Sequence, residues 1–127
     1  MRKVEHRTGA VEEAIRTHAA LFDIPTQAVV ATTLDGRIVY WSDTAARMYG
    51  WSSEEVLGRD ILEVTPSETT REQAAEIMSR LREGQIWSGE FHVRTRAGEG
   101  FCAHVRDVPV RDDRGELIGI VGISHGA

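Results

Sequence analysis

Paired carboxylates are the most obvious acid–base candidates in this chain. Such pairs can act as general acid and general base when their surroundings separate the two pKa values. They occur at Glu12-Glu13, Glu54-Glu55 and Asp112-Asp113. The helix dipole alone favours acids in the first turn of a helix, which accounts for Glu54 and Glu55. The other two pairs fit solvated helix and turn surfaces, so none of the pairs predicts catalysis.

Histidine and cysteine are the other residues with metal or redox chemistry. Three imidazoles can hold zinc, and such a site would require His18, His92 and His104 to meet. We expect these histidines to be polar residues of the surface, so we predict no metal site. The single cysteine, Cys102, excludes an internal disulfide and a cysteine-rich zinc site. It favours a reducing compartment, so we expect a cytoplasmic protein.

The composition and the absent motifs exclude several classes of protein. The 127 residues suffice for one domain with a single core. There is no nucleophile elbow, no His-Glu-x-x-His pair and no Gly-rich phosphate loop, so we do not predict an enzyme. The net charge of −5, without any basic block, argues against nucleic-acid and anionic-membrane partners. No apolar run is long enough to span a membrane.

The N-terminal region should form a helix that flanks the main domain. Residues 1–9 are polar and should be frayed, whereas Val11, Ile15 and Phe22 belong to an apolar stripe at helical spacing. Pro25 should end this helix. We therefore predict a flanking helix within residues 1–24 and a main domain over residues 25–127. The flanking helix could serve as a dimerisation element.

The middle of the chain alternates turn signals with short elements. Asp35-Gly36 predicts a hairpin turn between strands at 28–33 and 38–41. Ser42 or Asp43 should cap a helix that Gly50 ends. Ser52 with Glu55, and Thr69 with Glu72, form capping boxes for a short and a longer helix.

The last third reads as strands at 86–95, 101–110 and 117–124, separated by turns. Two strands, then helices, then three strands is an α+β pattern. We predict a five-stranded antiparallel sheet with short helices over one face.

Residues 25–124 resemble a PAS domain of the bacterial sensory-box type. Several short motifs carry the resemblance together, in family order and at family-like spacing. They are Asp35-Gly36-Arg37-Ile38, Ser42-Asp43-Thr44-Ala45-Ala46, Tyr49-Gly50-Trp51-Ser52, Glu55-Val56-Leu57-Gly58, Trp87-Ser88-Gly89-Glu90, Arg94-Thr95-Arg96-Ala97-Gly98, Pro109-Val110-Arg111-Asp112, Gly115 and Gly119-Ile120-Val121-Gly122. The resemblance implies the PAS fold and a cleft between sheet and helices that holds a ligand or cofactor.

Strand alternation combined with this resemblance predicts which residues line the cleft. Its polar members, Thr32, Asp107 and Ser124, need partners that a ligand or water could supply, although Asp107 could instead pair with an arginine. The apolar members could equally fill an ordinary core. The candidate set is Val30, Thr32, Ile38, Tyr40, Met48, Ile61, Ile77, Met78, Phe91, Val93, Ala103, Val105, Asp107, Ile120 and Ser124, with Ala45, Leu57, Leu81 and Gly122 also placed inward.

The resemblance also bears on cofactors. Light-sensing relatives form a flavin–cysteine adduct at a motif that here reads Gly58-Arg59-Asp60-Ile61-Leu62, with Ile61 at the cysteine position. Adduct photochemistry is therefore excluded. Haem-binding relatives use a histidine of the long central helix, and residues 69–83 contain none, which disfavours haem. FAD without an adduct stays open, with Tyr40, Trp41 and Trp87 available for stacking, as do a small organic ligand and an empty core.

These features predict a regulatory module rather than a catalyst. The resemblance implies a sensor that relays a signal to an output domain, such as a histidine kinase, a cyclic-dinucleotide enzyme or a transcription regulator. Many members continue into a coiled coil where this chain reads His125-Gly126-Ala127. Either the output element lies beyond this sequence, which we favour, or the signal leaves through the N-terminal helix. The alternative is a ligand-free module that forms a homodimer through Val11, Ile15, Phe22 and the outer sheet face.

Overall fold

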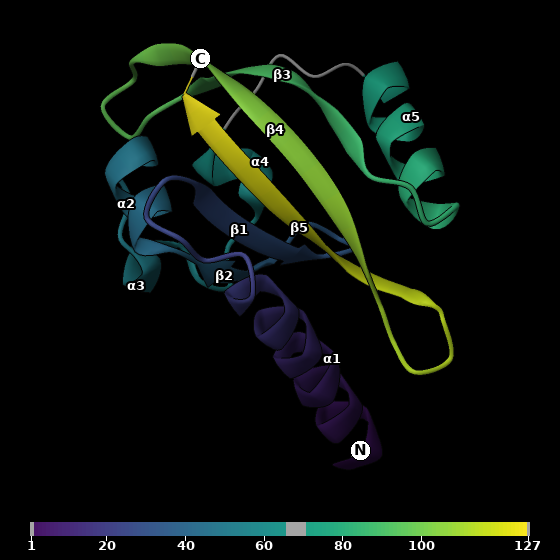
Figure 1. Cartoon of the computed structure of the whole chain (residues 1–127). Coiled ribbons are helices and arrows are strands. Elements are labelled where there is room, and N and C mark those ends of the chain that lie inside the picture. The colour runs from purple at the N-terminus through teal and green to yellow at the C-terminus, as the bar shows by residue number, and fades with distance from the viewer. Residues whose placement is uncertain (1, 66–70, 127) are drawn as a thin grey trace.

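The computed structural model describes residues 2–65 and 71–126. The elements are α1 (Arg2–Ala20), β1 (Ala28–Thr33), β2 (Ile38–Trp41), α2 (Asp43–Tyr49), α3 (Ser53–Val56), α4 (Ile61–Val64), α5 (Arg71–Arg82), β3 (Trp87–Arg94), β4 (Gly100–Arg111) and β5 (Leu117–Gly126). One twisted sheet carries helices on both faces, and the N-terminal part of α1 projects beyond it (Figure 1). The predicted α+β class is confirmed.

All five strands form one antiparallel sheet in the order β2-β1-β5-β4-β3. The last strand of the chain, β5, therefore lies at the centre. It pairs with β1 on one side, where Ser124 faces Ala28, and with β4 on the other, where Ser124 faces Val105. This insertion joins the N-terminal hairpin to the C-terminal one.

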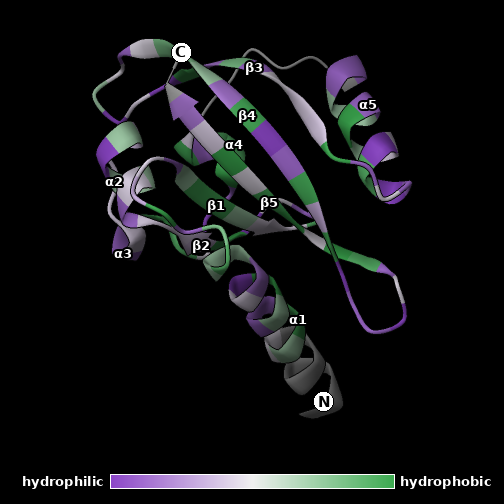
Figure 2. Ribbon diagram, in the orientation of Figure 1, coloured by the Kyte–Doolittle hydropathy of each residue, from purple (hydrophilic) through white to green (hydrophobic). Residues whose placement is uncertain are grey.

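The two faces of the sheet are covered by different helices. On the inner face, Ile38 and Trp41 of the sheet pack with Ala45 and Tyr49 of α2. On the outer face, the apolar side of α1 packs on β1, β2 and β5 through buried residues that include Ile15 and Ala19. Helix α5 covers one end, where Ile77 and Leu81 meet Trp87. The remaining surface of α5 is largely hydrophilic (Figure 2).

Most of the predicted caps are present. The Ser42 hydroxyl accepts a hydrogen bond from the Ala45 N–H and caps α2, and Gly50 ends that helix at a φ of 80°. Ser52 and Glu55 form the complete capping box of α3. Thr69, the predicted cap of the longer helix, lies outside the described residues. At the other end of α5, the Arg111 guanidinium donates to the carbonyls of Leu81 and Arg82 at 3.2 and 2.7 Å.

Three features differ from the sequence-based expectations. Helix α1 begins at Arg2 rather than near residue 10, and it ends at Ala20, ahead of Pro25. Helix α4 was not predicted, because four residues are too few to show a helical period; Asp60 caps it by accepting from the Leu62 N–H. A bulge in β2, where Val39 is the extra residue opposite the Ala31–Thr32 step of β1, breaks the alternation across the β1–β2 hairpin.

Candidate functional site

A cavity of about 260 Å³ lies between the inner face of the sheet and the short helices. Strands β1, β3, β4 and β5 supply its floor and sides, whereas α2 and α4 and the residue after α4 cover it. Its lining is mainly apolar with a few polar groups. The lining residues are Val30, Thr32, Tyr49, Ile61, Leu62, Thr65, Phe91, Val93, Val105, Asp107, Ile120, Gly122 and Ser124.

One wall of the cavity carries a hydrogen-bonded pair of hydroxyls. Tyr49 Oη and Ser124 Oγ lie 2.9 Å apart in a buried position. Burial raises the pKa of the Tyr49 hydroxyl, the hydrogen bond to Ser124 opposes this, and the nearby Asp107 carboxylate raises it again. Tyr49 therefore stays a neutral hydroxyl that faces the cavity.

Asp107 is the carboxyl group of the cavity. Its cross-strand neighbour on β5 is Gly122. A Cβ atom added to Gly122 would lie 3.2 Å from Asp107 Oδ1, so the carboxyl leans over the bare glycine backbone. Burial raises the pKa of Asp107 from its ordinary value of 3.8 to about 7. Among the described residues it has no hydrogen-bond or ion-pair partner, so the arginine considered above does not neutralise it there.

Nine of the predicted cleft residues line this cavity. That they bind a ligand stays a prediction. Gly122, which was also placed inward, lies at its floor. The nine are Val30, Thr32, Ile61, Phe91, Val93, Val105, Asp107, Ile120 and Ser124.

The inward placement of Tyr40 was wrong. The extra residue Val39 in the β2 bulge changes the face on which Tyr40 emerges, and Tyr40 packs with the α1 cluster on the outer face. Its hydroxyl donates a hydrogen bond to the Asp23 carboxylate. Burial, this hydrogen bond and the negative charge of Asp23 raise the pKa of Tyr40 to about 12. Strict alternation fails here because the bulge adds a residue to one strand.

Other predicted cleft residues face inward or pack nearby without reaching the cavity. Ile38 and Ala103 are buried in the core beneath the helices, with Met48 at its edge. Ile77 and Met78 pack with Trp87 behind Phe91 and Ile120, so α5 borders the cavity but these two residues do not line it. Leu57 was placed inward wrongly, since 48% of its surface is exposed.

Sequence reasoning missed three lining residues, namely Tyr49, Leu62 and Thr65. Tyr49 lies one helical turn after the buried Ala45, so the spacing of α2 contained the signal. Leu62 and Thr65 depend on α4, for which no local pattern existed. The Thr65 hydroxyl donates to the Ile61 carbonyl at 3.2 Å, which folds the end of α4 over the cavity.

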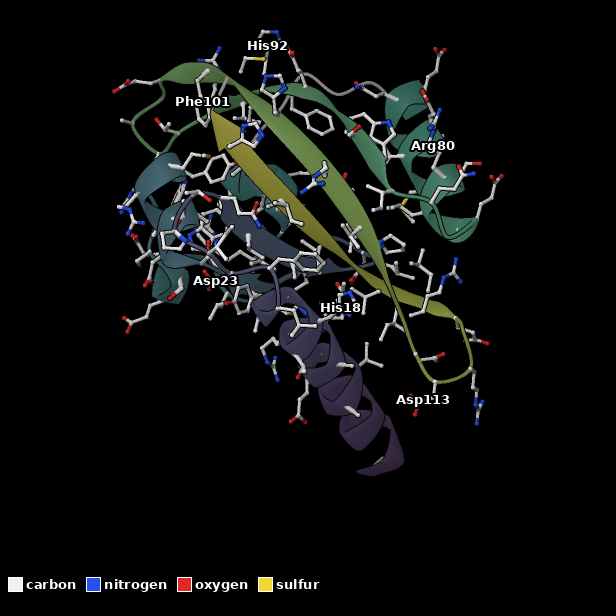
Figure 3. All side chains as sticks on the ribbon, viewed as in Figure 1. His18, Asp23, Arg80, His92, Phe101 and Asp113 are labelled. Carbon is white, nitrogen blue, oxygen red and sulfur yellow. The ribbon has the colours of Figure 1, made fainter. Side chains whose placement is uncertain are left out.

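The three histidines considered for zinc and the single cysteine lie on outer surfaces. The Cys102 thiol donates to the Glu90 carboxylate at 3.1 Å, and His104 lies 3.6 Å from the same carboxylate. His18 on α1 and His92 on β3 lie well apart (Figure 3). Within residues 2–65 and 71–126, no cluster of histidine, cysteine and acidic residues has metal-binding geometry.

The family model for the PAS fold matches residues 19–125. This chain is a PAS domain. None of the described helices of the PAS domain is long and apolar enough to cross a membrane.

Relatives of this PAS domain include much larger signalling proteins. It is 41% identical to the methanogenesis regulatory histidine kinase FilI of Methanothrix harundinacea across 41% of this chain and 7% of the relative. It is 29% identical to Phototropin-2 of Oryza sativa subsp. japonica across 73% of this chain and 10% of that protein. The chain thus spans a tenth or less of these two relatives, and it is a sensory signalling module by family.

Solved structures share the fold at low identity. The PAS domain of a Colwellia psychrerythraea protein matches with a TM-score of 0.68 and 23% identity, over 87% of this chain and 94% of the other. A light-oxygen-voltage domain studied with a flavin analogue matches with a TM-score of 0.67 and 22% identity, over 80% of this chain and 77% of the other.

Proposed function

We propose that this PAS domain binds a small organic ligand in the cavity and relays its presence to an output domain of a larger protein. One observation carries the proposal. The cavity is mainly apolar, and its Asp107 carboxyl has no partner among the described residues. Ligand sites combine an apolar lining with a few polar groups that fix orientation.

The β1–β2 turn offers a route from the cavity to α1. On one side, the N–H of Ile61, which lines the cavity, donates to the Gly36 carbonyl at 2.9 Å. On the other side, the Arg37 guanidinium contacts the Glu12 carboxylate of α1 at 2.6 Å. A ligand that displaces α4 would therefore act on the same turn that holds α1.

Signalling would follow from a population shift between two packings of the sheet and its helices. A ligand can shift that equilibrium only by its differential affinity for the two states. A histidine kinase is the output supported by the FilI relative, and a cyclic-dinucleotide enzyme is the other expected class. We further propose a homodimer in a reducing, cytoplasmic setting, which suits the thiol of Cys102.

Flavin is a second possible occupant, supported by the light-oxygen-voltage relatives. A cysteinyl adduct does not fit this chain, because Ile61 lines the cavity while Cys102 lies on the outer side of β4 against Glu90. Trp41 and Trp87 lie outside the lining, so a flavin held without an adduct would have to stack on Tyr49 or Phe91.

An absorbance spectrum with native mass spectrometry of the purified chain tests occupancy directly. A flavin gives visible absorbance bands and an added mass, whereas a colourless ligand gives mass alone. For a chain purified empty, a metabolite library screened by ligand-observed NMR should yield binders that Ile61→Trp and Val105→Trp exclude. Leu57→Trp is the matched control, because Leu57 is exposed and outside the lining. Equal binding by the control and both cavity variants would overturn the proposal.

The alternative is a ligand-free dimerisation module. The exposure of Leu21 and Ile24 at the end of α1 favours it, with 77% and 47% of their surfaces accessible. By contrast, Val11, Ile15 and Phe22 already pack on the sheet of their own chain. Leu21→Asp with Ile24→Asp should convert a dimer to a monomer in light scattering under this alternative, and an unchanged dimer would contradict it.

A further inference from the structure

The chemistry of the cavity is asymmetric. Its polar groups are four hydroxyls, of Thr32, Tyr49, Thr65 and Ser124, and one carboxyl, of Asp107. Tyr49 and Ser124 satisfy each other, and Thr65 bonds to the Ile61 carbonyl. Asp107 and Thr32 are the lining side chains without a hydrogen-bond partner among the described residues, and Asp107 is the one of the two that can carry a charge.

The position of Asp107 lets a ligand reach it. Gly122 lies between Asp107 and Val30 on one rung of the sheet, and it has no side chain to cover the carboxyl. The walls around this rung are apolar, with Val30, Ile120 and Val105 all in the lining. A bound molecule thus meets a carboxyl at the floor and hydrocarbon at the sides.

The described lining of the cavity contains an acidic side chain but no basic one. Asp107 and Tyr49 are its titratable groups, since the described lining residues from β1, α4, β3 and β5 cannot ionise near neutral pH. No lysine, arginine or histidine lines it among the described residues. An anionic ligand would find no cation there and would be repelled by an ionised Asp107.

The volume limits the size of the ligand. An apolar protein cavity of about 150 Å³ holds benzene. The cavity here measures about 260 Å³, which leaves room for one ring and a short polar substituent. The rings of Tyr49 and Phe91 in the lining suit such a planar body.

We infer that the ligand is a small cation with an apolar body, such as an aryl or alkyl amine, whose positive group pairs with Asp107. This inference rests on the proposed function, because it requires that the cavity binds ligands. The positive group would supply the partner that the carboxylate lacks, and the apolar body would fill the remaining volume. A charge-assisted hydrogen bond is roughly twice as strong as a neutral one.

Three probes of similar shape separate charge from fit, namely benzylamine, benzyl alcohol and benzoate. Calorimetric titration of the whole chain at pH 8 should give benzylamine at least a tenfold advantage over benzyl alcohol and no detectable binding of benzoate. Asp107→Asn should remove the advantage of the amine while leaving the alcohol unaffected. Asp113→Asn is the matched control, because Asp113 is an exposed turn residue away from the cavity.

A second measurement uses the unaltered chain and so does not depend on a variant that folds. The pKa of Asp107 is about 7, so the free carboxyl is mostly protonated at pH 6. Pairing with a cationic amine requires the carboxylate, so amine binding at pH 6 should release most of one proton. Titrations in buffers with different ionisation enthalpies count that proton. The neutral benzyl alcohol should release none.

The outcomes distinguish this inference from the proposed function. Benzyl alcohol binding as tightly as benzylamine, or benzoate binding best, would overturn the cationic class, and loss of that binding in Ile61→Trp would leave the ligand-binding function standing. Amine binding without proton release at pH 6 would also overturn the pairing with Asp107. Failure of all three probes to bind at millimolar concentration would count against both.

Discussion

Ile15 of α1 lies directly over the backbone of Gly119 on β5. A Cβ atom added to Gly119 would lie 2.5 Å from Ile15 Cδ1 and 2.8 Å from the Thr32 carbonyl oxygen. Ile15 is completely buried there, because the lack of a side chain at Gly119 leaves room for it against the sheet. The next residue of β5, Ile120, lines the cavity on the other face. Helix docking and ligand cavity thus share one central strand.

Gly119→Ala should force α1 away from the sheet. Overpacking of this kind costs about 1–3 kcal/mol of unfolding free energy, which urea denaturation measures. Gly9→Ala is the control, because nothing lies within 4 Å of an added Cβ there. In a helix that change should stabilise by up to about 1 kcal/mol. Equal effects of both substitutions would mean that α1 does not dock on Gly119.

Arg37→Ala should weaken the link between α1 and the β1–β2 turn more than it weakens the fold. The Arg37–Glu12 pair is partly exposed, so its loss should lower the unfolding free energy by less than about 1 kcal/mol. Ligand-induced changes in hydrogen exchange of α1 amides should disappear in the variant. Arg16→Ala, which removes a weaker 3.9 Å pair with the same carboxylate, should retain them. Retention in Arg37→Ala would exclude this route.

Asp107 should make the free chain less stable as pH rises from about 4 to 7. In this range the folded state keeps a proton that the unfolded state loses, because the folded pKa is about 7 and the ordinary value is 3.8. The loss amounts to as much as roughly 4 kcal/mol and levels off above pH 7. Asp107→Asn should match the wild type near pH 4 and exceed its stability at pH 8 in urea titrations. A constant difference across that range would refute this assignment.

Tyr49→Phe should destabilise the chain by about 1–2 kcal/mol, because it leaves the Ser124 hydroxyl without its partner in a buried place. The double variant Tyr49→Phe with Ser124→Ala should recover part of this loss. Tyr40→Phe provides the contrast, since that hydroxyl bonds to Asp23 at the exposed outer surface. Additive effects of the Tyr49 and Ser124 substitutions in thermal unfolding would show that the two hydroxyls do not interact.

Local features were predictable from the sequence because neighbouring residues fix them. The Asp35-Gly36 turn, the Ser42 cap and the Ser52–Glu55 capping box each involve groups a few residues apart. The four-residue helix α4 and the bulge in β2 were not predictable, since neither leaves a periodic signal. The bulge moved Tyr40 to the outer face, and α4 brought Leu62 to the cavity.

The sequence by itself determined the PAS family, the five strands and most of the inward-facing residues, because alternation and caps are short-range properties. The tertiary structure alone decided which inward residues surround empty space. That outcome depends on β5 lying between β1 and β4, which sets Gly122 beside Asp107. It also depends on α5 packing on Trp87, which leaves Ile77 and Met78 outside the lining. Whether a cavity carboxyl such as Asp107 finds a partner depends on its neighbours in space, and these come from distant parts of the chain.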